Sequence, residues 1–171
     1  MESKAKALGH PIHPMLIVFP LGLFVAAVAF DILYLITGNA AFATVSFWNI
    51  AGGVIGGLAA AVFGLVDWIA IPSGTRAKAV GLWHGGGNVV VVALFAVSWL
   101  LRMGARDNTP DMVAIALGLV GAGIGAVTGW LGGELVDRLG VGVDENANLN
   151  APNSLTDKSA HAGQRVEGRG A

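Results

Sequence analysis

The sequence predicts an all-α integral membrane four-helix bundle, and three observations lead to this prediction. Of the 171 residues, 54% are hydrophobic and only 12% are charged, whereas soluble domains carry roughly 25% charged residues. The apolar residues gather in four long runs, and each run reaches the roughly 20 residues that a membrane-spanning helix needs. The chain has no cysteine, which excludes disulfides, thiolate-held iron–sulfur clusters and covalently attached c-type haem.

The four runs define four spans, and charge is almost absent from each of them. Asp31 and Asp67 are the charged residues inside the first two spans, and the other two carry charge only at their ends. Such runs read as transmembrane helices because a charge is costly in the bilayer. The predicted spans cover about residues 14–37, 41–71, 79–102 and 111–137.

The chain divides into a four-transmembrane-helix domain, residues 1–143, and a tail, residues 144–171. From Asp144 onward the composition shifts to Asn, Asp, Ser, Gly and Arg, with few apolar residues. Such a segment buries too little apolar surface to offset its ordering entropy. We therefore expect a disordered cytoplasmic tail, in which His161 has no function.

Four spans place both termini on the same side of the membrane. Cytoplasmic loops carry an excess of Lys and Arg near the span ends. On the opposite side Arg102 and Arg106 lie beside Asp107 and Asp111. We therefore expect both termini in the cytoplasm, on the side that carries Lys4, Lys6, Arg76, Lys78 and Arg138.

Glycines four residues apart indicate how the helices pack. Small residues at this spacing let membrane helices approach closely. Tight packing within the bundle explains them, and a homodimer face or close approach to a flat cofactor would use the same physics. The longest strip is in the fourth span and consists of Gly121, Gly125, Gly129 and Gly133.

A weak internal repeat suggests a duplicated helical hairpin. His13 and His84 are 71 residues apart, and each is followed ten residues later by Leu-Phe. The second span ends in Leu-Val-Asp at 65–67, and the fourth carries the same tripeptide at 135–137. Parallel repeats related by an axis along the membrane normal are known in membrane proteins, so we treat duplication as a hypothesis.

The polar residues of the spans gather near one membrane face. His10 and His13 each precede a proline, which disfavours the α-region, so we expect an extended segment here with the helix starting near Pro14. His84 lies inside a helical pattern, and Asn88 four residues later shares its face. Ionisable groups at such positions mark a functional site by default. The carboxylates Asp67 and Glu134 are expected at the same face.

Each of these residues also has a purely structural explanation. His13 could cap its helix, and His84 could be a core histidine bonded to Asp67 or Glu134. The two carboxylates could instead reach the interface or pair with a basic side chain. The candidate partners for such pairs are Arg76, Lys78 and Arg138.

Several stretches resemble a bacterial membrane family filed as the Domain of Unknown Function 2231 family, over roughly residues 9 to 143. The His-Pro-x-His-Pro opening is the most specific of them. The stretches that match are Gly-His-Pro-Ile-His-Pro-Met-Leu-Ile-Val-Phe-Pro at 9–20, Gly-Leu-Val-Asp-Trp at 64–68, Ile-Pro-Ser-Gly-Thr-Arg-Ala at 71–77, His84 with Asn88, and Leu-Gly-Val-Gly-Val at 139–143.

The resemblance implies a multi-pass protein of the bacterial cytoplasmic (inner) membrane. Some relatives look fused to, or encoded beside, Rieske-type or cytochrome domains, which implies a link to electron transfer. Many relatives carry a further histidine just before the phenylalanine of the first span, where this chain has Val18. A mechanism that requires this third histidine is therefore not implied for this chain.

Three functions remain open at this point. The first is a haem b-binding or quinone-linked redox accessory, with His13 and His84 as ligands, His10 and Asn88 beside the cofactor, and Asp67 or Glu134 bonded to the imidazoles. The second is a zinc or iron site. The third is a structural accessory protein without a cofactor. Besides the lipid bilayer, the expected partners are redox proteins or quinone, and the net charge of −1 argues against nucleic acid. The metal site would use His10, His13, His84 and Glu134.

Overall fold

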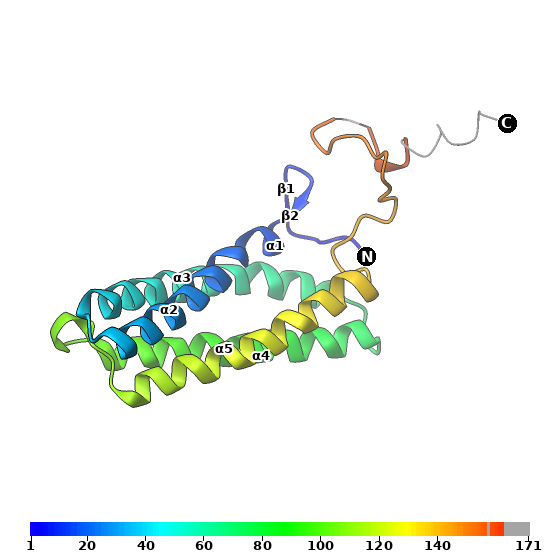
Figure 1. Ribbon diagram of the computed structural model, residues 1–171. Helices are drawn as coiled ribbons and strands as arrows, with labels where there is room; N and C mark the ends of the chain where they lie inside the picture. The colour runs from blue at the N-terminus through cyan, green and yellow to red at the C-terminus, as the bar shows by residue number, and fades with distance from the viewer. Residues whose placement is uncertain (157, 163–171) are drawn as a thin grey trace.

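The computed structural model describes residues 1–156 and 158–162. Four long helical segments lie alongside one another (Figure 1), and all four are long and apolar enough to cross a membrane. The predicted fold class is therefore confirmed. In chain order the elements are the strands β1 (Lys6–Ala7) and β2 (His10–Pro11), the helices α1 (Ile12–Leu16), α2 (Val18–Thr37), α3 (Ala40–Ala70) and α4 (Arg76–Arg102), the 3-10 helix η1 (Arg106–Asn108), the helix α5 (Met112–Gly133) and the π-helix η2 (Glu134–Arg138).

Short polar residues start three of the long helices. The side chains of Asn39, Thr75 and Asp111 each accept a hydrogen bond from a backbone N–H in the first turn of α3, α4 and α5. Such N-caps satisfy donors that have no partner within the helix. Gly38, at φ +68°, ends α2 in the left-handed conformation that suits a residue without a side chain. The hairpin between α2 and α3 is therefore tight.

The first span starts earlier than predicted. Its helix begins at Ile12, before the predicted start near Pro14, so His13 is helical. Proline is tolerated in a first turn because the N–H that it lacks would have no partner there. Pro20 cannot donate to the carbonyl of Leu16, and the helix is interrupted at Ile17, between α1 and α2.

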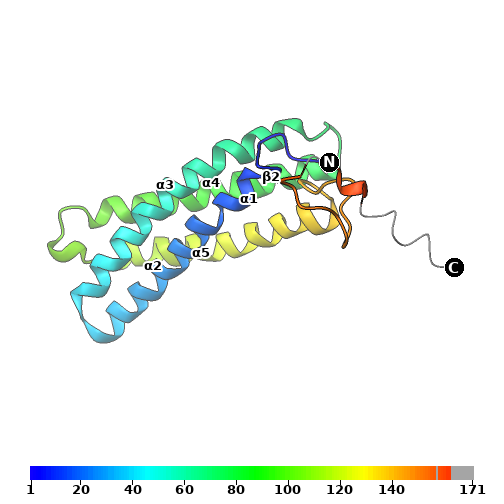
Figure 2. The ribbon, with the colours of Figure 1, turned by 90° about the horizontal axis from the view of Figure 1, so that it is seen from above.

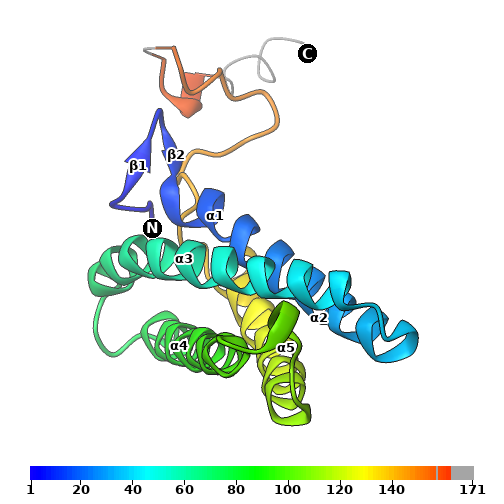
Figure 3. The same ribbon diagram turned by 90° about the vertical axis from the view of Figure 1, so that its left-hand side faces the viewer.

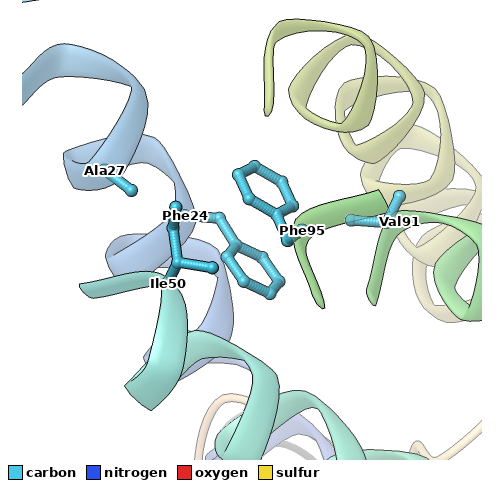
Figure 4. Close-up of a cluster of buried hydrophobic side chains, with 5 residues drawn as sticks. All are labelled: Phe24, Ala27, Ile50, Val91 and Phe95. Carbon is cyan, nitrogen blue, oxygen red and sulfur yellow. The ribbon is translucent and has the colours of Figure 1, made fainter. Parts of the chain in front are cut away.

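The centre of the bundle is apolar. Phe24 of α2 and Phe95 of α4 stack with their ring centres 4.0 Å apart and their planes at 5°. Ala27, Ile50 and Val91 complete the buried cluster, as Figure 4 shows. Because the ring pair lies between α2 and α4, it joins the two helical hairpins.

The helices form two hairpins that pack against each other. Figure 3 shows α2 beside α3 and α4 beside α5, and α3 also packs on α4. Residues of α1–α2 face the residues 71 positions later in α4, which supports the hypothesis of a duplicated hairpin. The facing pairs are His13 with His84, Phe24 with Phe95, and Asp31 with Arg102.

The N-terminal strands and the segment after η2 lie at the same end of the molecule (Figures 1 and 2). Gly142 donates its N–H to the carbonyl of Met1 at 2.9 Å, and the Ser154 hydroxyl lies 3.1 Å from His10 Nε2. Thus part of the segment for which we predict disorder contacts the N-terminal strands. Residues 157 and 163–171 of this tail lie outside the described residues.

Candidate functional site

Two histidines from different hairpins meet at the end of the bundle that holds the chain termini. The imidazole centres of His13, from α1, and His84, from α4, are 6.3 Å apart, and the ring planes stand at 87°. Both side chains are partly buried between helices. The sequence therefore identified two residues that the structure brings face to face.

Each imidazole is held by a backbone carbonyl of the next long helix. His13 Nδ1 lies 2.9 Å from the carbonyl oxygen of Ala60, and His84 Nδ1 lies 2.8 Å from that of Thr128. A carbonyl oxygen can only accept, so both Nδ1 atoms carry the proton in the neutral rings. Each Nε2 is then the nitrogen with a free lone pair, which is the atom that can bind a metal.

A glycine makes room for each ring. A Cβ atom on Gly64 would lie 2.9 Å from Cε1 of His13, and one on Gly132 would lie 3.0 Å from Cε1 of His84. Gly64 follows Ala60 by four residues, as Gly132 follows Thr128. The same local unit, a histidine bonded to a carbonyl and resting on a glycine one turn later, therefore occurs in both hairpins.

The surroundings of the two histidines differ at one point. Asn88 donates through Nδ2 to the carbonyl of His84 at 2.9 Å, with the same nitrogen 3.4 Å from His84 Nε2. The hydroxyl of Thr128 donates to Asn88 Oδ1 at 3.0 Å. The residue 71 positions before Asn88 is Ile17, so this amide network is present on the His84 side alone.

Two other predicted site residues have partners away from this pair. The exposed His10 contacts Ser154, and the carboxylate of Asp67 accepts hydrogen bonds from Ser3, Lys4 and Ala5. The expected bond from an imidazole to Asp67 is therefore not made.

Glu134 shows which structural explanation holds for this carboxylate. It pairs with Arg76 at 2.6 Å, as one of the alternatives from the sequence anticipated. His84 is bonded to the carbonyl of Thr128 and not to Asp67 or Glu134. Within residues 1–156 and 158–162, no group of three or more His, Cys, Asp or Glu side chains is placed to hold a metal ion. The proposed four-ligand set is thus not assembled.

A second polar centre, at the opposite end of the bundle, was missed from the sequence. Arg102 Nη1 and Nη2 each donate to one carboxylate oxygen of Asp31 at 2.7 Å. Arg102 is 0% exposed and Asp31 is 3% exposed. The hydroxyls of Ser46 and Ser98 accept further bonds from Arg102 at 3.0 and 3.2 Å. This fork-to-fork geometry makes the ion pair strong and directional.

The repeat could have revealed this ion pair. Asp31 and Arg102 are separated by 71 residues, the same offset that relates His13 to His84. In the sequence alone Arg102 stands at the end of an apolar run, as a charged residue of the following loop would. Applying the repeat offset to every polar residue of the spans would have placed the two opposite each other.

Comparisons with known proteins identify a family. A family model described as "Predicted membrane protein (DUF2231)" matches residues 9–145. The comparisons with the curated proteins and with the solved structures gave no significant match.

Proposed function

This chain belongs to the DUF2231 family of membrane proteins, and we propose that it binds one haem b between His13 and His84 and acts as a redox accessory in the bacterial cytoplasmic membrane. Its electron partners would be quinone or another redox protein. The observation that carries the proposal is the facing pair of imidazoles, each with Nδ1 held by a backbone carbonyl. The described residues give His13 Nε2 no hydrogen-bond partner, and the contact of His84 Nε2 is with Asn88 Nδ2 at 3.4 Å.

The number of ligands favours haem over a zinc or non-haem iron ion. Protein zinc sites use three or four side-chain ligands, and the described part of the chain brings two histidines together without a third ligand. Haem iron needs only one or two axial ligands from the protein, because the porphyrin supplies the others. The donor set therefore fits haem better than a bare metal ion.

The separation of the rings also fits this assignment. The imidazole centres of His13 and His84 are 6.3 Å apart, and a metal–imidazole nitrogen bond is about 2 Å long. These two side chains are therefore close enough together that both would hold haem b.

The protein groups around the pair have definite tasks in this proposal. The carbonyls of Ala60 and Thr128 fix the tautomer that presents Nε2, which is how ligating histidines are commonly oriented. Gly64 and Gly132 leave space for the rings. Haem b, when bound, supplies reversible one-electron chemistry. The protein holds the two ligands and fixes their orientation.

A specific observation also favours the structural alternative. The bonds of the two histidines to Ala60 and Thr128 link α1 to α3 and α4 to α5. Such bonds stabilise helix ends without any ligand. In that case the histidines would contribute to stability alone.

The charge distribution supports cytoplasmic termini. Orientation follows the Lys and Arg residues close to the span ends. The end of the bundle that holds the chain termini carries the five basic residues named in the sequence analysis, and the opposite end carries Arg102 and Arg106.

A homodimer is compatible with part of the α5 glycine strip. Gly121 packs on Phe95 inside the bundle, whereas a Cβ on Gly129 or Gly133 would meet nothing within 4 Å. These two outer glycines would be the residues through which a second copy approaches closely.

The test is an absorption spectrum of the detergent-purified protein, produced with ample haem, before and after reduction with dithionite. We expect a Soret band that shifts on reduction. His13→Ala and His84→Ala should each remove most of the bound haem, because each imidazole would hold the haem. His10→Ala and His161→Ala are the matched controls and should leave the haem content unchanged.

Two results would count against the proposal. A featureless spectrum would favour the structural alternative, and full haem content in both His13→Ala and His84→Ala would contradict the ligand assignment. If the protein is colourless, a lower unfolding temperature of His84→Ala, with no bound metal in the parent, would identify a purely structural role.

A further inference from the structure

The two halves of the repeat begin differently beside the histidine pair. Helix α4 starts at Arg76, two turns before His84, whereas α1 starts at Ile12, one residue before His13. The turns before His84 therefore have no helical counterpart before His13. In their place residues 1–11 form an irregular segment and the β1–β2 hairpin.

This N-terminal segment is fastened to the end of α3 by the carboxylate of Asp67. The hydroxyl of Ser3 lies 2.8 Å from both carboxylate oxygens. The N–H groups of Lys4 and Ala5 donate to Oδ1 at 2.8 and 3.4 Å. Ser3 is only 6% exposed. Successive backbone N–H groups around an anion form a favourable nest, and bonds to a charged acceptor are stronger than neutral ones.

The fastened N-terminal segment lies next to Gly64, the residue against which the His13 ring packs. Asp67 follows Gly64 by three residues on α3, so the two share a helix face, and Gly64 is the residue on which the His13 ring rests. Ile12 donates its N–H to the carbonyl of Ala5 at 2.9 Å. Residue 5 is thereby tied to the start of the helix that carries His13.

The same segment reaches the other hairpin. Gly142, which follows η2, donates to the carbonyl of Met1 at 2.9 Å. The segment therefore joins the ends of the two helices, α3 and α5, whose glycines seat the two imidazoles. In the part of the chain that the structure describes, every hydrogen-bond partner of the Asp67 side chain belongs to residues 3–5.

We propose that Ser3–Ala5 is a strap, latched by the Asp67 carboxylate, that controls access of aqueous solutes to the His13–His84 pair. Release of the three donors from Asp67 frees the strap and exposes His13. The device does not depend on haem, because the strap is tied to Asp67 and to the start of the helix that carries His13 whether or not the pair binds a cofactor.

The test measures strap opening and histidine access separately, on protein without haem. Hydrogen exchange reports the amides of Lys4 and Ala5, and peptide mass spectrometry reports the rate at which diethyl pyrocarbonate modifies His13. In Asp67→Asn we expect both rates to rise about tenfold, because bonds to a charged acceptor are lost. The modification rate of the exposed His10 is the internal reference and should not change.

Asp137→Asn is the matched control, because this exposed carboxylate lies at the same end of the molecule and has no bond to the strap. It should leave both rates at the parental values. Unchanged amide exchange at Lys4 and Ala5 in Asp67→Asn would show that Asp67 does not hold the strap. Faster amide exchange with an unchanged modification rate of His13 would show that the strap does not control access to the histidines.

A thiol probe gives an independent measurement of the latch. The chain has no cysteine, so Ser3→Cys introduces a single reactive group at a buried position. We expect slow labelling by a charged maleimide when Asp67 is present and about tenfold faster labelling in the Asp67→Asn background. Ser73→Cys, at an exposed loop position, should react equally in both. Equal, fast labelling of Ser3→Cys in both backgrounds would contradict the latch.

Discussion

At one end of the bundle His13 faces His84, and at the other end Asp31 faces Arg102, eighteen residues farther along each of the same two segments. In the charged pair the polar groups bond to each other: each terminal guanidinium nitrogen of Arg102 donates to one carboxylate oxygen of Asp31. In the imidazole pair they do not, because each imidazole keeps one nitrogen without a strong protein partner. Residues 71 positions apart thus form a closed ion pair at one end of the bundle and, at the other end, a pair of imidazoles whose Nε2 atoms have no strong protein partner.

The largest effect is expected from breaking the ion pair. Asp31→Ala leaves the buried guanidinium of Arg102 without its counter-ion, and removing one partner of a buried pair lowers the free energy of unfolding by about 3–5 kcal/mol. Thermal unfolding in detergent would measure the loss. The double variant Asp31→Leu/Arg102→Met should recover most of it, because apolar replacement of the whole pair is close to neutral. A stability of Asp31→Ala equal to that of the parent would show that this end is not the structural joint.

An intermediate effect on stability is expected from adding a side chain at Gly64 or Gly132, the glycines against which the two imidazoles pack. Gly64→Ala and Gly132→Ala each place a methyl group about 3 Å from an imidazole, and overpacking of this kind costs about 1–3 kcal/mol. Both variants should also lower haem content, because the rings are displaced. Gly129→Ala is the control, since its Cβ would meet nothing within 4 Å. Equal stability and equal haem content in all three variants would mean that Gly64 and Gly132 do not position the rings.

The smallest effect is expected from the amide network on the His84 side. Thr128→Val keeps the carbonyl that holds His84 but removes the hydroxyl bonded to Asn88 Oδ1, at a cost of about 1 kcal/mol. Nitrogen NMR should still show the proton of His84 on Nδ1. Thr37→Val is the control, because its hydroxyl bonds only to the carbonyl of Leu33 in the same helix. A shift of the His84 proton to Nε2 in Thr128→Val would show that the network, and not the carbonyl, sets the tautomer.

The sequence by itself determined the four helices and the site's central pair. A bilayer tolerates a spanning segment only if its backbone is fully hydrogen-bonded within the segment, so four long apolar runs can become only four helices. Asn39, Thr75 and Asp111 set their starts. Because equal positions in a repeat meet across its axis, the offset of 71 residues pointed to His13 with His84. The same offset contained Asp31 and Arg102.

Only the tertiary structure decided the partners of the other polar residues. Asp67 bonds to the strap and Glu134 to Arg76, and neither reaches the histidines beside which the sequence placed them. The physical reason is that helices in lipid are apolar on every face, so the pattern of apolar residues does not reveal the rotation and depth at which each helix packs. Rotation and depth determine whether side chains at the same membrane face touch or lie apart.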